Sequence, residues 1–189
     1  MKNILLDYNL RIRLPIILFV VITASVITYF VSRAERDGIG YSPEQPIAFS
    51  HKLHAGTMGI DCQYCHLSVK TSAHASIPAL SVCMNCHTVA RKNSSEIIKL
   101  TNYYKDSSSI QWKRVHSVPD YAYFNHSVHV NKGFGCEVCH GKVENMDVVK
   151  QVGEFTMSAC LHCHRNAKNN FPNLKELSTG PIHCNACHR

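Results

Sequence analysis

The longest run of apolar positions lies near the start of the chain. Residues Leu14 to Val31 form an uncharged stretch of 18 residues, LPIILFVVITASVITYFV. This length meets the lower limit for a helix that crosses a bilayer. Basic residues flank the run on both sides, with Lys2, Arg11 and Arg13 before it and Arg33 and Arg36 after it. We therefore expect a transmembrane signal anchor over residues 14–32, preceded by a short N-terminal segment over residues 1–13.

A cleaved signal peptide is the alternative interpretation of this run. Such a peptide would have a shorter apolar stretch, followed directly by an A-x-A cleavage site. Here the stretch ends in Tyr29-Phe30-Val31-Ser32-Arg33, which is a poor peptidase site. The sequence favours the uncleaved anchor. Flanking charge alone does not orient it, because both flanks carry positive residues.

Beyond a linker over residues 33–48, the pattern predicts few regular elements. One short helix is expected over residues 95–104, with Ser94 as its N-terminal cap. A polar turn over residues 105–109 follows it. A chain this short buries only a modest apolar core by itself, so we expect additional covalent bonds or bound groups to stabilise the fold.

Five copies of Cys-x-x-Cys-His, numbered here motifs 1 to 5 in chain order, account for all ten cysteines. Their cysteines are Cys62 and Cys65, Cys83 and Cys86, Cys136 and Cys139, Cys160 and Cys163, and Cys184 and Cys187. The histidines that follow them are His66, His87, His140, His164 and His188. This motif is the attachment signal for c-type haem, in which the thiols form thioethers and the histidine is the proximal iron ligand. The sequence therefore predicts five covalently bound haem c groups.

Two other uses of cysteine pairs explain the motifs less well. A zinc module uses Cys-x-x-Cys pairs but needs no histidine directly after each pair. A disulfide framework fits an even cysteine count outside the cytoplasm but also ignores the histidines. With haem as most of the hydrophobic core, we expect a mainly irregular and α-helical multihaem cytochrome c fold, with short helices near each motif and little or no sheet.

The bound groups also change the charge. The formal net charge of the polypeptide is +7. Each bis-histidine ferric haem adds about −1, which brings the total to about +2 when oxidised and about −3 when reduced. The basic composition is therefore no indication of nucleic-acid binding.

The part of the chain outside the membrane contains an internal repeat. Phe49-Ser50-His51-Lys52-Leu53-His54 matches Phe124-Asn125-His126-Ser127-Val128-His129, and each copy precedes a haem motif. A second motif follows in each half, and the second half adds a fifth. We therefore expect a two-haem half over residues 49–91, a connector over residues 92–118 and a three-haem half over residues 119–189.

The paired histidines are candidates for the distal iron ligands. Histidines three positions apart share a helix face, so two imidazoles on one turn can reach two different haems. This argument selects His51, His54, His126 and His129. The fifth ligand stays open between His116, Met157 and Met146, with His74 and His183 possible and His162 poorly placed inside its own motif. A methionine ligand would raise the potential of its haem.

The histidine pairs, the two-plus-three layout and connecting stretches such as Val115-His116-Ser117-Val118-Pro119-Asp120-Tyr121 resemble the pentahaem subunit of alternative complex III. The resemblance covers nearly the whole chain, including a single N-terminal anchor. It implies an electron carrier, not itself an enzyme, in a quinol:electron-acceptor oxidoreductase. The implied partners are a polytopic quinol-oxidising subunit, an iron–sulfur subunit and a monohaem cytochrome c or an oxidase. Covalent haem attachment occurs outside the energy-transducing membrane, so we expect the haem domain on the periplasmic side of a bacterial inner membrane.

Two rival functions remain open. A multihaem reductase would need an open iron, often with an altered motif, whereas all five motifs here end in histidine and distal candidates are plentiful. A free-standing membrane quinol dehydrogenase cytochrome that feeds a periplasmic reductase would share the anchor and the bis-histidine haems. The repeated histidine pairs and the connector favour the complex subunit.

Overall fold

The computed structural model describes residues 8–174 and 177–189. The chain divides into two compact units, Met1–Gly38 and Ile39–Arg189. In the described part the regular elements are all helical, and no β-strand occurs. This confirms the expectation of a helical fold with short elements.

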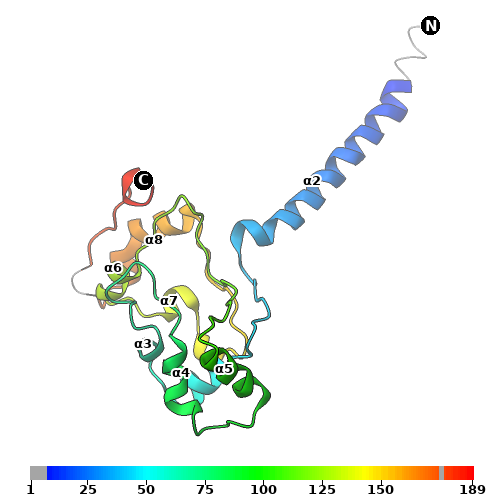
Figure 1. The fold of residues 1–189 in the computed structure, drawn as a ribbon. Helices are drawn as coiled ribbons and strands as arrows, with labels where there is room; N and C mark the ends of the chain where they lie inside the picture. Colours follow the sequence, from blue (N-terminus) through cyan, green and yellow to red (C-terminus); the bar gives the residue numbers. More distant parts are fainter. Residues whose placement is uncertain (1–7, 175–176) are drawn as a thin grey trace. The chain divides into compact units, whose positions relative to one another are not determined.

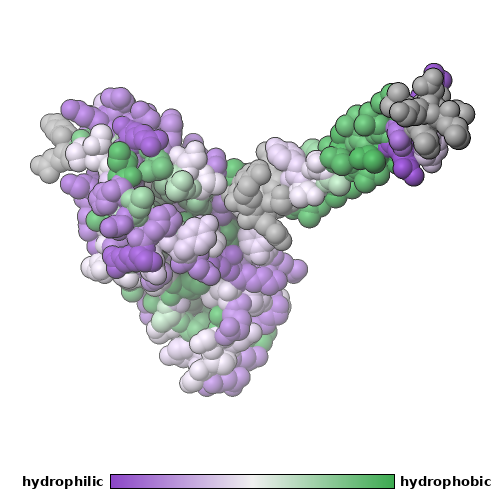
Figure 2. Space-filling model, turned by 90° about the horizontal axis from the view of Figure 1, so that it is seen from above, coloured by the Kyte–Doolittle hydropathy of each residue, from purple (hydrophilic) through white to green (hydrophobic). Residues whose placement is uncertain are grey.

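In the residues that the structure describes, the first unit is one long helix. A short π-helical turn, η1 (Asn9–Arg13), continues directly into α2 (Leu14–Asp37) (Figure 1). The apolar span Asn9–Val31 has 23 residues and a mean hydropathy of 2.5, and none of it is buried. Figure 2 shows the apolar surface that this helix presents. The helix is long and apolar enough to cross a membrane, and it begins before Leu14 because Arg11 and Arg13 are compatible with a helical backbone.

The second unit is built from short helices joined by irregular chain. Its elements are η2 (Lys52–Thr57), α3 (Cys62–Cys65), α4 (Leu80–His87), α5 (Ser95–Lys105), α6 (His126–Asn131), α7 (Glu137–His140), η3 (Val143–Asn145), α8 (Met157–Asn170) and η4 (Cys184–Ala186). Motifs 1 to 5 lie in or directly against α3, α4, α7, α8 and η4. Each pair of cysteines is therefore wound into a helical turn, as attachment to one porphyrin edge requires.

Local signals in the sequence set these short helices. The Asp61 side chain accepts a hydrogen bond from the Gln63 amide (2.8 Å) and caps α3. The Thr156 hydroxyl accepts from the Ala159 amide (3.3 Å) and caps α8. At the end of α7, Gly141 takes a φ of +67°, a conformation that glycine adopts without strain.

The predicted connector helix is α5, which begins at Ser95 as expected and ends at Lys105. Ser94 has the extended backbone of a cap residue, but its side chain makes no capping hydrogen bond. Glu96, in the first turn, instead accepts from the Ala48 amide (2.8 Å) and pairs with Lys99 (2.7 Å). The hydrogen bond from Ala48 holds the start of α5 against the chain that precedes η2, and the pair with Lys99 lies within the helix.

The apolar core of the second unit is small. Ile47, Met84, Leu100 and Ile110 form one buried cluster where α4 packs against α5. In the described part no large side chain is completely buried. The buried apolar cluster of the polypeptide alone is therefore small, which agrees with a domain held together by covalently attached groups.

Candidate haem-attachment sites

The ten cysteines are all free thiols and are exposed or partly exposed. Burial raises the pKa of the Cys65, Cys83 and Cys139 thiols, so these groups are neutral at pH 7. Within the described residues, no three His, Cys, Asp or Glu side chains converge as metal ligands would. This arrangement fits thiols that bond separately to porphyrin edges and does not fit a zinc cluster or a disulfide framework.

The histidines of four motifs are oriented by backbone carbonyl groups. The Nδ1 atoms of His66 and His87 lie 2.7 and 3.1 Å from the carbonyl oxygens of Ser76 and Ala90. Those of His164 and His188 lie 2.7 and 2.9 Å from the carbonyl oxygens of Pro181 and Tyr121. A carbonyl oxygen only accepts, so Nδ1 carries the proton in each ring and Nε2 keeps its lone pair for a metal.

Three of the repeated histidines follow the same rule. Nδ1 of His54 donates to the Ser50 carbonyl (2.9 Å), and Nδ1 of His129 donates to the Asn125 carbonyl (2.7 Å). Nδ1 of His126 donates to the Ala73 carbonyl in the other half of the domain (2.8 Å). Their Nε2 atoms are likewise available as ligands.

Each histidine pair is held by the phenylalanine that begins its repeat. Phe49 stacks on His54 with ring centroids 4.4 Å apart and meets His51 edge-on at 4.8 Å. Phe124 stacks on His129 at 4.5 Å and meets His126 edge-on at 4.8 Å. The sequence pattern F-x-H-x-x-H was visible, but the role of its phenylalanine in setting both imidazole planes was missed.

The structure brings three repeated histidines opposite motif histidines. Metal–nitrogen bonds of about 2.0 Å, with about 1.1 Å from nitrogen to ring centre, place two imidazoles across one metal ion with centroids about 6.2 Å apart. The observed centroid distances are 6.1 Å for His54 and His87 and 6.3 Å for His126 and His140. His129 and His164 are 6.1 Å apart. These separations fit two axial ligands on one haem iron.

His51 lies among other imidazoles. Burial, together with the smaller effects of the charges of His66, His54 and His116, lowers its pKa to about 4. His51 is therefore a neighbour of His66, the motif 1 histidine, and is neutral at pH 7. A neutral ring is the form that binds iron.

His116 meets the ring of His140 edge-on, with centroids only 4.4 Å apart. This distance is shorter than the separation of two ligands across one iron. The Nε2 atom of His116 is buried and makes no hydrogen bond in the described part of the structure. A buried nitrogen without a partner fits a ligand position.

The two methionine candidates differ in surroundings. Met157, at the start of α8, is 67% exposed. Met146 is partly buried, and its methyl group lies close to Gly141 at the end of α7. Neither observation selects one of them, so the fifth distal ligand stays a prediction.

Comparisons with known proteins agree with these features. Residues 122–189 match the family model described as cytochrome c7 and related cytochrome c, and residues 28–116 match the class III cytochrome c family. The chain is also similar to the multihaem cytochrome c subunit of menaquinone reductase from Nitratidesulfovibrio vulgaris. The two are 26% identical in an alignment that covers 77% of each chain. The thiol pairs, the protonated Nδ1 atoms and the imidazole separations all fit covalently bound haem, and both halves of the chain are similar to multihaem cytochromes c, which are electron-transfer proteins.

Proposed function

We propose that this chain is the membrane-anchored pentahaem electron carrier of a quinone-linked respiratory complex. The observation that carries the proposal is the set of three imidazole pairs whose ring centroids lie 6.1 to 6.3 Å apart. Where a hydrogen bond orients one of these rings, its Nδ1 atom points to a backbone carbonyl. A haem iron that bound two histidines would have no free coordination position for a substrate. This supports electron transfer and disfavours the reductase alternative.

The residue roles in this proposal follow the geometry. The ten cysteines hold the groups covalently, and the five motif histidines are the proximal ligands. His54, His126 and His129 are the distal ligands for motifs 2, 3 and 4, and His51 serves motif 1 because it lies beside His66. Bound haem c would supply one-electron chemistry, and the protein sets its ligands, burial and spacing.

The anchor supports a place at the membrane. The apolar helix over Asn9–Val31 would hold the carrier beside a membrane-embedded quinone site, with the haem domain on the periplasmic side. A polytopic quinol-oxidising subunit, an iron–sulfur subunit and a monohaem cytochrome c are the proposed partners, on the resemblance to alternative complex III. A cytochrome c or a terminal oxidase would then receive the electrons.

The opposite direction of electron flow is a second candidate. The relative from Nitratidesulfovibrio vulgaris is named as a subunit of a menaquinone reductase. A relay of bis-histidine irons passes electrons in either direction, and the potentials of its partners decide which. Purification of the intact complex from membranes tests both directions. If the chain carries electrons away from quinol, menaquinol should reduce the haems. If it carries electrons to quinone, reduced haems should reduce a menaquinone analogue. A chain that leaves the membrane without partners would contradict membership of a complex.

Ligand substitution tests the electron-transfer assignment directly. His126→Ala and His129→Ala should each convert one haem in five to high spin or to a substitute ligand, and the double variant should convert two. Covalent attachment should survive, since the thioethers and proximal ligands are untouched. His162→Ala is the matched control, because His162 is exposed and lies inside a motif. If the double variant leaves every haem low-spin and unchanged, these histidines are not ligands.

A further inference from the structure

We propose that the five motifs follow one another in space in the order 2–1–3–4–5, so that motifs 2 and 5 are the two ends of the electron relay. This inference rests on the proposed set of five haems. It differs from chain order, because the first two motifs are exchanged and motif 1 becomes the junction with the second half. Figure 1 shows the same progression within the second unit: α4 and α3 lie toward one end, α7 lies in the middle, and α8 and the C-terminus lie toward the other end.

The first step joins motif 2 to motif 1. The Asn85 side chain, inside motif 2, donates a hydrogen bond to the hydroxyl of Tyr64, inside motif 1 (3.1 Å). One turn at the start of η2 serves both motifs, because His54 lies opposite His87 while His51 lies beside His66. Burial raises the pKa of the Cys83 thiol, and the nearby Cys65 thiol raises it further.

The second step joins motif 1 to motif 3. The Cys136 thiol of motif 3 is hydrogen-bonded to the Cys62 thiol of motif 1. The attachment points of motifs 1 and 3 are therefore neighbours, although Cys62 and Cys136 are 74 positions apart in the chain.

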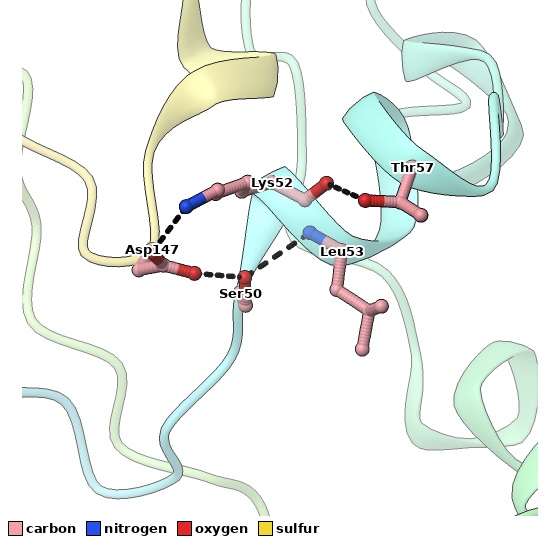
Figure 3. A network of polar contacts seen from close by, with 5 residues as sticks. All are labelled: Ser50, Lys52, Leu53, Thr57 and Asp147. Carbon is pink, nitrogen blue, oxygen red and sulfur yellow. Dashed lines mark hydrogen bonds and ion pairs between the residues drawn. The ribbon is translucent and has the colours of Figure 1, made fainter.

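A polar network fixes this junction (Figure 3). Asp147, which follows motif 3, accepts a hydrogen bond from the Ser50 hydroxyl (2.8 Å) and pairs with Lys52 (3.3 Å). The Lys52 amide donates to the Met146 carbonyl (3.0 Å). A Cβ atom at Gly56 would overlap the Glu144 carbonyl oxygen, so η2 and η3 are in backbone contact. The histidine-bearing segment of the first half is thereby held against the chain that follows motif 3.

The third step joins motif 3 to motif 4 and repeats the first. One turn of α6 carries His126, opposite His140, and His129, opposite His164. Burial raises the pKa of the Cys139 thiol, and the Cys163 and Cys160 thiols of motif 4 raise it further. Each half thus uses one histidine pair to bridge two motifs.

The last step joins motif 4 to motif 5. The segment that leads into motif 5 passes directly over His164, because the Gly180 amide donates to the His164 carbonyl (2.9 Å) and His164 Nδ1 donates to the Pro181 carbonyl (2.7 Å). The Cys187 thiol adds to the rise that burial causes in the pKa of Cys160. Motif 5 therefore follows motif 4 both in sequence and in space.

Removal of single haems from the full-length protein in detergent distinguishes this order from chain order. Cys62→Ala/Cys65→Ala removes the motif 1 haem, and Cys83→Ala/Cys86→Ala removes the motif 2 haem. Mass spectrometry of each variant should show four attached haems. In the electron paramagnetic resonance spectrum of the oxidised protein, loss of motif 1 should leave one haem in four with a simple, uncoupled low-spin signal. Loss of motif 2 should leave all four remaining haems magnetically coupled. The reverse result, with an uncoupled haem only after loss of motif 2, would support chain order and overturn the proposal.

A second measurement keeps the test decisive if a variant does not fold. His54→Met leaves all attachments in place and raises the potential of the motif 2 haem. In a redox titration followed by nuclear magnetic resonance, reduction of that haem should shift the midpoint of the motif 1 haem more than that of the motif 3 haem, because the interaction of charges falls with distance. A larger shift at motif 3 overturns the order. Fewer than five haems on the wild-type chain would instead contradict the proposed function.

Discussion

Gly180→Ala should damage the site of motif 4 without touching a ligand. A Cβ atom at this position would lie 2.6 Å from Cγ, 2.8 Å from Cδ2 and 2.9 Å from Cβ of His164. Ordinary contacts between such atoms are about 3.5–4.0 Å, so the new methyl group must move by roughly 1 Å. The imidazole cannot give way easily, because Nδ1 is bonded to the Pro181 carbonyl and Nε2 faces the proposed iron.

The cost of this substitution follows from overpacking. Inserting a methyl group where neighbours cannot move costs about 1–3 kcal/mol. In a domain of 150–250 residues, each kcal/mol lowers Tm by about 2–4 °C, so we expect a decrease of several degrees. The shift of the 178–182 segment should also lengthen the hydrogen bond to Nδ1. A weaker bond at Nδ1 makes the imidazole a poorer donor and raises the potential of that haem.

The assay combines thermal unfolding with a redox titration of the purified protein. Thr179→Ala is the matched control, because it alters the adjacent exposed position and adds no atom. The control should melt with the wild type. If Gly180→Ala also melts within about 1 °C of wild type and titrates identically, the close approach of this segment to His164 is refuted.

Three further outcomes are expected. Acid–acetone extraction should leave five haems attached to each chain, as measured by mass spectrometry; two or three haems, or bound zinc, would contradict the assignment of the motifs. The oxidised protein should be entirely low-spin and should not bind carbon monoxide at equilibrium, because we expect two protein ligands on every iron; a high-spin fraction in undamaged protein would revive the reductase alternative. A variant that lacks residues 1–36 and carries a cleavable signal should yield a soluble domain with all its haems, since the second unit begins at Ile39; tight membrane binding of this domain without partners would show that the anchor is incorrectly assigned.

The sequence predicted the elements whose cause is local. The apolar run could be placed because a bilayer-spanning helix needs only composition and length. The connector helix was predicted to within one residue at its end, since Ser95 to Lys105 has helix-forming residues and a polar turn beyond it. The haem-attachment motifs could be identified from the sequence because one turn of chain contains all the residues that attachment needs, and their role stays a prediction.

Features that depend on distant parts of the chain could not be predicted. Ser94 was expected to cap α5 with its side chain, but it makes no capping hydrogen bond. The start of α5 is instead held by Glu96, which accepts a hydrogen bond from the amide of Ala48, 48 positions away. The orientation of His126 depends on the Ala73 carbonyl, 53 positions away. The proposed exchange of motifs 1 and 2 in space likewise depends on contacts such as that of Ser50 with Asp147, 97 positions away, for which the sequence contains no periodic signal.

The docking of α6 on the first half has a consequence for assembly. The amides of His126 and Ser127 donate to the carbonyls of Ala73 and Ser72 (both 3.2 Å), and the Asn131 side chain donates to the Lys70 carbonyl (2.9 Å). The helix that carries two of the proposed distal histidines is thus packed on the chain that directly follows motif 1. If the chain is exported from its N-terminus, as the proposed location requires, the first half emerges first and can serve as the template on which the later half acquires its ligand geometry. Maturation of this protein would then proceed from the first half to the second. Substitutions in residues 70–73 would mainly disturb the ligand geometry of the second half, which is completed last.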